Sequence, residues 1–316
     1  SIRTSLIPGS YGETIVMRIL DPKSIQINIE DMGMDPYLYE IVLKEIAKPN
    51  GLILVTGPTG SGKTTTLYAF LRRIYSTEIN IITIEDPVEY RLKGITQTQI
   101  SDKKDYGFAE GLKAALRQDP DVIMVGEIRD SETAKTAVQS ALTGHLVFST
   151  LHTNNAAGVI PRLSDLEVNP KIMPSALSLS IAQRLVRKLC EKCKKEKEAK
   201  EKEINTLKTI VDKMIINGKD LNRYNLNKDG PIKLYEAVGC EECNMTGYKG
   251  RIGIFEAIMT NEDIEKIMPN NPSEREIKQV ANKQGILSMR EDGLVKILRG
   301  VTSYEEVLSV VDLNEE

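Results

Sequence analysis

The sequence predicts an α/β fold with a mainly parallel sheet, and three observations lead to this prediction. Short β-branched segments at residues 52–56, 79–84, 122–125 and 146–151 alternate with helical patterns, as in sheets whose two faces are covered by helices. A glycine-rich segment follows the first of these strands, and acidic residues follow the second and the third. Because ligands of open parallel sheets bind at the carboxyl ends of strands, these segments are candidates for a functional site.

Length and composition indicate a globular protein of more than one domain. The chain has 316 residues, enough for two domains at about 150 residues each. It is 41% hydrophobic and 28% charged, with a net charge of −3, which argues against a protein that binds nucleic-acid phosphates. The sequence has neither a signal-peptide pattern nor an apolar run near the roughly 18 residues of a membrane span. We therefore expect a cytoplasmic location, and the start at Ser1 within strand-like sequence suggests a piece of a longer protein.

The elements outside the central strands follow from local patterns. Residues 2–20 alternate apolar and polar positions around a turn at residues 8–10, which predicts a strand pair followed by a polar linker over residues 21–35. Residues 36–48 have helical spacing, and we also expect a long helix over residues 174–189.

The later part of the chain changes in composition. Residues 191–203 consist almost entirely of Lys, Glu, Ala and Cys, which favours an exposed helix or a flexible insertion over a binding segment. Ser273 with Glu276, and Ser303 with Glu306, have the spacing of capping boxes. We therefore expect a small helical subdomain at the end of the chain.

A P-loop pattern lies between the first central strand and a helical segment. In this motif, backbone N–H groups and the helix N-terminus surround phosphates, Lys63 reaches the β and γ phosphates, and Thr64 offers a hydroxyl to Mg²⁺. The alternative, a glycine-rich turn that binds nothing, fits this strand-to-helix context poorly. The predicted nucleotide-binding residues are Gly57, Pro58, Thr59, Gly60, Ser61, Gly62, Lys63, Thr64 and Thr65.

Acidic residues end the strands at residues 79–84 and 122–125. The first strand runs into the segment 85–89, which ends in Glu89, and the second runs into Glu127. Either acid alone is more often an ordinary strand-end charge. Beside a P-loop, however, one acid can order the Mg²⁺ shell while another polarises the attacking water, so the set predicts hydrolysis or phosphoryl transfer.

The two histidines of the chain, His145 and His152, lie at the two ends of the strand at residues 146–151. A lone histidine usually has only a packing role. The placement of both histidines on one strand makes a functional role, as a γ-phosphate sensor or as a hydrogen bonder at an interface, equally favoured. Seven residues apart on a strand, the two side chains point to opposite faces, so we expect at most one to face the nucleotide.

All cysteines of the chain lie in two Cys-x-x-Cys pairs. In a cytosolic protein this pattern favours a tetrahedral zinc site over disulfides, and four thiolates leave no open position, so the zinc is structural. Four free thiols are the alternative. The predicted ligands are Cys190, Cys193, Cys240 and Cys243.

Together these motifs resemble the secretion ATPase superfamily, in particular the motors of type II secretion and type IV pilus assembly (the GspE/PilB group). Residues 84–89 resemble its Asp box, residues 116–130 its Walker B region and residues 143–153 its His box. The resemblance implies a RecA-like core, with Glu89 as general base and Glu127 as support for Mg²⁺ and water.

The first residues resemble the end of the second N-terminal domain of this family. There two arginines reach the phosphates of bound nucleotide, which implies this role for Arg3 and Arg18; ordinary strand charges are the alternative. The resemblance also implies the following organisation: residues 1–33 as the end of that domain plus a linker, 34–189 as the ATPase core, 190–250 as the zinc module and 251–316 as the helical subdomain.

The resemblance further implies a hexameric motor that binds ATP and Mg²⁺ and drives an inner-membrane platform protein. Retraction motors of type IV pili lack the cysteine module, so assembly is favoured, while secretion and pilus extension stay unresolved. A zinc-stabilised, ATP-dependent nucleic-acid-binding module is the alternative, disfavoured by the net charge and by an aromatic content of 5%. A small-molecule P-loop kinase would need a motif for a second substrate, and we find none.

Overall fold

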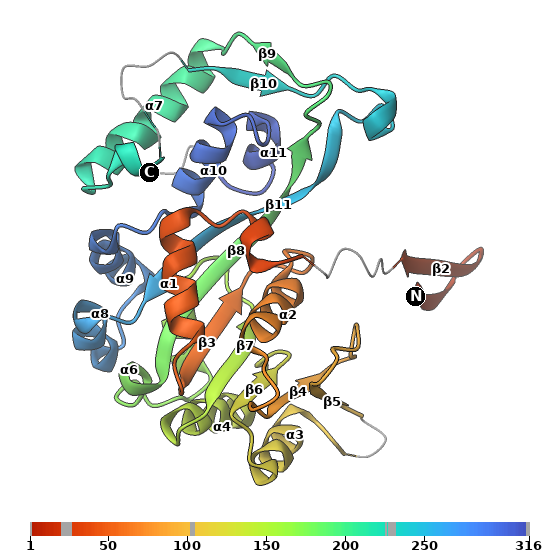
Figure 1. Cartoon of the computed structure of the whole chain (residues 1–316), viewed down its shortest axis with the longest axis vertical. Coiled ribbons are helices and arrows are strands. Elements are labelled where there is room, and N and C mark those ends of the chain that lie inside the picture. Colours follow the sequence, from red (N-terminus) through yellow and green to blue (C-terminus); the bar gives the residue numbers. More distant parts are fainter. Residues whose placement is uncertain (1, 20–26, 102–104, 225, 227–231, 314–316) are drawn as a thin grey trace.

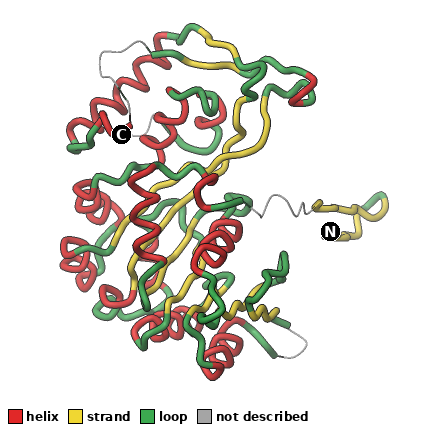
Figure 2. Tube along the Cα trace, viewed as in Figure 1, coloured by secondary structure: helices red, strands yellow, loops and turns green. Residues whose placement is uncertain are grey.

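The computed structural model describes the chain except residues 1, 20–26, 102–104, 225, 227–231 and 314–316. A seven-stranded sheet with the order β11-β8-β3-β7-β6-β4-β5 forms its centre, with helices on both faces (Figures 1 and 2). All neighbours pair in parallel except β11, which is antiparallel to β8. The strands are β3 (Gly51–Thr56), β4 (Ile81–Glu85), β5 (Thr96–Gln99), β6 (Val122–Val125), β7 (Leu146–Leu151), β8 (Leu177–Leu189) and β11 (Tyr248–Met259).

This architecture confirms the mainly parallel sheet and the four central strands that the sequence predicts. Strand β3 shows why both faces are covered, because its side chains alternate between two apolar clusters. Leu52 and Leu54 pack in the cluster that contains α3 and α4, whereas Ile53 and Val55 pack in the cluster that contains α1 and α2, and all four are fully buried. The four helices are α1 (Pro36–Ile46), α2 (Lys63–Ile74), α3 (Phe108–Ala115) and α4 (Ser131–Leu142).

The N-terminal strand pair is also confirmed. Strands β1 (Ile2–Gly9) and β2 (Gly12–Ile19) form an antiparallel hairpin in which Arg3 lies opposite Arg18. The side chains of these two arginines lie outside what the structure describes, so their predicted contact with nucleotide stays a prediction.

The expected helix over residues 174–189 is wrong. A single helical turn, α6 (Met173–Ala176), passes into the long strand β8. The second half of this segment has both a helical spacing of apolar residues and good helix formers, but pairing with β3 on one side and β11 on the other overrides this local preference.

Strands β8 and β11 extend from the sheet into a second part of the molecule (Figure 1). The cysteine pairs lie just after the end of β8 and just before the start of β11. The charged segment at 191–203 forms the short strand β9 (Lys195–Lys197), which pairs with β10 (Leu234–Glu236), and the first turn of α7 (Glu201–Ile216). Helix α7 buries Leu207, Ile210 and Met214. The charged segment is therefore a folded piece of this second part, held by the β9–β10 pairing and by α7, and is not a flexible insertion.

The remaining helices are short, and most of them have a side-chain N-cap. Both predicted capping residues, Ser273 and Ser303, accept hydrogen bonds from the third helical residue, Glu276 N and Glu306 N. The helices are α5 (Val159–Asp165), α8 (Glu262–Ile267), α9 (Glu274–Ala281), α10 (Met289–Leu298) and α11 (Tyr304–Leu308). In the part of the chain that the structure describes, no helix is long and apolar enough to cross a membrane.

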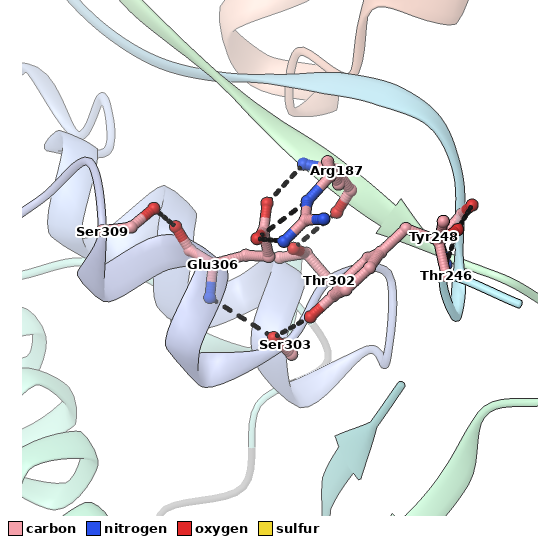
Figure 3. Close-up of polar contacts among 7 residues, drawn as sticks. All are labelled: Arg187, Thr246, Tyr248, Thr302, Ser303, Glu306 and Ser309. Atoms are coloured by element: carbon pink, nitrogen blue, oxygen red, sulfur yellow. Dashed lines mark hydrogen bonds and ion pairs between the residues drawn. The ribbon is translucent and has the colours of Figure 1, made fainter. Parts of the chain in front are cut away.

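Helix α11 is attached to β8 and β11 by a polar network (Figure 3). Arg187 of β8 donates from Nε to Oε1 of Glu306 at 2.9 Å, and its backbone N–H donates to Oε2 at 3.0 Å. The same guanidinium lies 4.1 Å from the ring centroid of Tyr248, whose hydroxyl is 3.0 Å from Oγ of Ser303. Thr302 donates to the carbonyl of Arg187 at 2.8 Å. One arginine thus connects α11 to the two strands that join both parts of the molecule.

Candidate active site

The P-loop connects β3 to α2 and depends on glycines with positive φ. Gly57, Gly60 and Gly62 have φ angles of 146°, 82° and 91°, which favour glycine. A Cβ on Gly57 would lie 2.5 Å from the carbonyl oxygen of Gln183, whereas one on Gly60 would meet no atom within 4 Å. Gly57 is therefore required by close packing against β8, and Gly60 leaves the tip of the loop open.

Lys63, the first residue of α2, points back along the loop. Its Nζ donates to the carbonyl oxygens of Gly57 at 2.8 Å and Pro58 at 3.2 Å. Burial lowers the pKa of Lys63, and the nearby Glu127 carboxylate opposes this effect. The lysine thus carries a partly desolvated charge at the mouth of the loop.

A cavity of about 740 Å³ lies beside the P-loop, where the acidic strand ends meet it. Lys63, Thr64, Glu89, Glu127 and His152 all line it. The structure thus brings together residues predicted separately from three strand ends and the loop, as expected for the carboxyl edge of a parallel sheet.

Glu127 lines this cavity with only 16% of its side chain exposed. One carboxylate oxygen lies 2.6 Å from Nη2 of Arg129, and the other lies 3.3 Å from Nε2 of His152. Two groups therefore orient the carboxylate at the end of β6.

Glu85 lies in the same acidic segment as Glu89, but its carboxylate is occupied by other side chains. It accepts from the hydroxyls of Thr83, at 2.5 Å, and Tyr68, and from Nε2 of Gln97 at 2.9 Å. Burial and the Glu85 charge raise the pKa of Tyr68, which stays a donor. Glu85 is therefore a buried acceptor that holds the end of β4.

The two histidines lie at opposite ends of β7. His152 lines the cavity, whereas Nδ1 of His145 lies 3.1 Å from the carbonyl oxygen of Ser140, and its own carbonyl accepts from Gly51 N at the start of β3. A strand of six residues spans about 20 Å. Within one chain, His145 is therefore remote from the P-loop.

Sequence reasoning missed Gln183 and Arg184, which lie on β8 beside the P-loop. The buried amide of Gln183 donates to Ser61 O at 2.5 Å and accepts from the hydroxyl of Thr66 at 2.7 Å. Arg184 donates to Gln183 O at 3.1 Å and to Asn154 O at 2.7 Å. No motif marks these residues, and the helix prediction for this segment placed them on the wrong element.

A second hollow of about 400 Å³ adjoins the P-loop on the side of β8 and β11. Gly62, Thr65, Leu185 and Arg251 line both this hollow and the larger cavity, whereas Phe255 lines only the second. The site thus has a charged compartment and a more apolar compartment that meet at the start of α2.

The four cysteines form one cluster, with sulfur atoms within 4.8 Å of one another. Sulfur–sulfur distances are 3.9 Å for Cys190 and Cys240, 3.8 Å for Cys193 and Cys243, and 3.7 Å for Cys240 and Cys243. A zinc tetrahedron with bonds of about 2.3 Å has six edges of about 3.8 Å. These three distances match that length, so the cluster is suited to zinc.

Backbone amides support the same assignment. Cys240 N and Gly247 N each lie 3.2 Å from Sγ of Cys243. Burial raises the pKa of this thiol, but these N–H donors, together with hydrogen bonds from the thiols of Cys240 and Cys193, outweigh it and bring the pKa to about 6. A thiolate with N–H donors is typical of a structural metal centre.

The sheet order, the P-loop and the acids at the strand ends define a protein of the P-loop fold class. A sequence profile of the family described as "Type II/IV secretion system protein" matches residues 1–309, and the chain belongs to this family. This confirms the resemblance inferred from the motifs.

Several relatives match nearly all of this chain. It is 46% identical to "Type II secretion system protein E" of Pseudomonas aeruginosa, with 98% of this chain and 58% of the relative covered. It is also 46% identical to "Type IV pilus assembly ATPase PilB" of Thermus thermophilus, with 98% and 33% covered. The chain thus spans little more than half the length of the first relative and a third of the second.

Among solved structures, the pilus retraction motor PilT with bound ADP is 27% identical, with a TM-score of 0.68 over 98% of this chain and 74% of that chain. The Legionella pneumophila ATPase DotB is 21% identical, with a TM-score of 0.63 over 98% and 72%. The second likeness concerns the fold alone.

Proposed function

We propose that this chain hydrolyses MgATP as the motor part of a hexameric ATPase that drives type II secretion or type IV pilus assembly. The observation that carries the proposal is the convergence of Lys63, Glu127, His152 and Glu89 on one cavity beside the P-loop. The names of the relatives supply the biological setting, and they leave secretion and pilus assembly as equal alternatives.

Each residue has a distinct role in this proposal. The P-loop amides and Lys63 bind the phosphates, and Lys63 exchanges its two carbonyl contacts for phosphate oxygens. Thr64 and Glu127 would hold Mg²⁺, which neutralises charge on the phosphates when bound. The apolar hollow beside Thr65 would take the nucleoside.

Glu89 acts as the general base that takes a proton from the attacking water. Glu89 lines the cavity at the end of the acidic segment that follows β4. In this proposal Glu85 holds the end of β4 through three hydrogen bonds, and Glu127, which Arg129 and His152 orient, serves the Mg²⁺ side of the site. His152 keeps the Glu127 carboxylate oriented and lies where it can sense the γ-phosphate. His145 is remote from the P-loop of its own chain, so in this proposal it forms hydrogen bonds at the interface between subunits.

Motor action requires contacts beyond one chain. We propose that subunits form a hexamer in the cytoplasm, that Arg3 and Arg18 close on bound nucleotide from a separate N-terminal body, and that an inner-membrane platform protein receives the motion. Hydrolysis releases the arginine contact and reopens the subunit. Zinc at the cysteine cluster would serve structure alone.

The test is phosphate release by this chain and by the full-length protein, each with and without the cytoplasmic domain of a candidate platform protein. We expect Mg²⁺-dependent hydrolysis that is faster in the longer protein and increases with the platform domain. DNA-stimulated hydrolysis with no response to the platform domain would instead support the nucleic-acid-binding alternative. Variants Arg3→Ala and Arg18→Ala of the longer protein test closure, because normal turnover in both would exclude it.

A further inference from the structure

The segment that follows His152, residues 153–156, is held by side chains from distant parts of the chain. Arg184 of β8 donates to Asn154 O at 2.7 Å, and Glu256 of β11 accepts from Ala156 N at 2.7 Å. Both contacts join a side chain to the backbone of the segment. They therefore fix the path of the chain directly after the histidine.

Arg184 and Glu256 belong to one electrostatic unit on the paired strands. Arg184 lies opposite Ile254 and Glu256 lies opposite Ala182, so the two charges are diagonal neighbours on one face of the sheet. Burial lowers the pKa of Arg184, and the Glu256 charge opposes this effect. Each charge thus stabilises the other in a partly buried position.

Glu256 bonds a second backbone group as well. Its other oxygen accepts from Met289 N at 3.2 Å, the first N–H of α10. A carboxylate that accepts two backbone N–H groups, one at a helix N-terminus, makes strong charge-assisted bonds. The segment after His152 is therefore connected through one carboxylate to β11 and α10.

Two further contacts complete the attachment. Thr153 N donates at 2.8 Å to the hydroxyl of Thr56, the last residue of β3 before the P-loop, and Nδ2 of Asn155 donates to Glu274 of α9 at 2.9 Å. Every residue from 153 to 156 thus makes a hydrogen bond to another element. The bonds of residues 154 and 156 are made by the charged pair Arg184 and Glu256.

We infer that Glu256 and Arg184 are positioning residues that set the place of His152 in the active-site cavity by fixing residues 153–156. The inference rests on the proposed function for its effect on turnover, but the position of His152 can be measured independently. The C-terminal part of the chain, which supplies Glu256, thereby becomes a component of the catalytic geometry.

Glu256→Gln tests this inference with little change in volume. Ala156 N and Met289 N bond different carboxylate oxygens, so in the amide one of them faces an NH2 donor in place of an acceptor. The substitution also removes the charge that faces Arg184. We expect turnover to fall about tenfold with little change in KM, since small displacements of catalytic groups reduce kcat strongly. Glu262→Gln, at an exposed position of α8, is the matched control and is expected to behave as wild type.

Imidazole NMR gives the readout that a merely structural role would leave unchanged. The chain has two histidines, so a histidine-labelled sample gives two sets of ring signals, and His152→Asn assigns them. In Glu256→Gln we expect the His152 signals to move while those of His145 stay in place. Unmoved His152 signals would overturn the inference, whatever the rate.

Two further outcomes separate this inference from the proposed function. Full turnover in His152→Ala would exclude the proposed role of His152, yet the NMR experiment would still decide its positioning. If Glu256→Gln fails to fold, Arg184→Lys replaces it, because lysine keeps the charge but lacks the fork that reaches Asn154 O and Gln183 O together. In that variant, too, unmoved His152 signals would contradict the inference.

Discussion

Replacing Gln183 with methionine removes the polar contacts of a buried side chain while nearly keeping its volume. Two hydrogen bonds are lost, at 2.5 Å to Ser61 O and 2.7 Å from the hydroxyl of Thr66. A buried group left without a partner costs about 1–3 kcal/mol. Thr66 has a second acceptor in Gly62 O at 3.3 Å, so Ser61 O contributes most of the loss.

We therefore expect Gln183→Met to lower the free energy of unfolding by about 2–4 kcal/mol. This sum takes about 1 kcal/mol for the Thr66 hydroxyl and about 1–3 kcal/mol for Ser61 O. Because Ser61 lies within the P-loop, nucleotide binding should weaken as well, by about tenfold for a loop that is less preorganised. Chemical denaturation and titration with a fluorescent ADP analogue measure the two effects. Gln139→Met, at an exposed position of α4, is the control. Wild-type stability and affinity in Gln183→Met would refute the role of β8 in holding the loop.

Three further predictions concern the acids and the cysteines. Glu89→Gln should bind ATP normally in a titration but lose at least about 100-fold in turnover, because an amide cannot accept the proton; equal losses of binding and rate would make Glu89 a structural acid. Metal analysis should find one zinc per chain, and its removal by a chelator should lower the melting temperature; a metal-free protein with unchanged melting would contradict this. Burial raises the pKa of Glu306, but hydrogen bonds from the Arg187 side chain and backbone outweigh it and leave the pKa below its ordinary 4.5. The ionised Glu306 carboxylate stabilises the folded state above pH 4.5. This stabilisation is lost as the pH falls through the lower pKa that Glu306 has in the folded state. Glu306→Gln should therefore cost about 1 kcal/mol at pH 7, since Arg187 is 55% exposed, and this cost should shrink as the pH is lowered below 4.5. A cost that stays constant down to acid pH would exclude the ion pair as its cause.

The sequence alone predicts the part of the fold that depends on local pattern. Strands such as β3 and β7 are short apolar runs between turn signals, so their bounds follow closely from the residues. The P-loop and the acids after β4 and β6 could be placed at one edge because parallel strands share their carboxyl ends. The cysteine cluster follows from residue type and spacing.

The rest depends on contacts between segments far apart in the chain. Gln183 and Arg184 carry no motif, and their role exists only because β8 pairs with β3 beside the P-loop. The attachment of residues 153–156 to Glu256 joins positions 100 residues apart. Periodicity within one segment cannot predict such a pairing, and in β8 it favoured the wrong element.

Phosphate release by the purified chain and by its Lys63→Ala variant shows whether the cavity beside the P-loop hydrolyses ATP. We expect Mg²⁺-dependent ATP hydrolysis by the wild-type chain and its near-complete loss in Lys63→Ala, because Lys63 is the side-chain cation of the P-loop that lies at the transferred phosphate. Melting curves of both proteins establish that the variant is folded. Equal rates in the wild-type chain and a folded Lys63→Ala variant would contradict the assignment of this cavity as the site of hydrolysis.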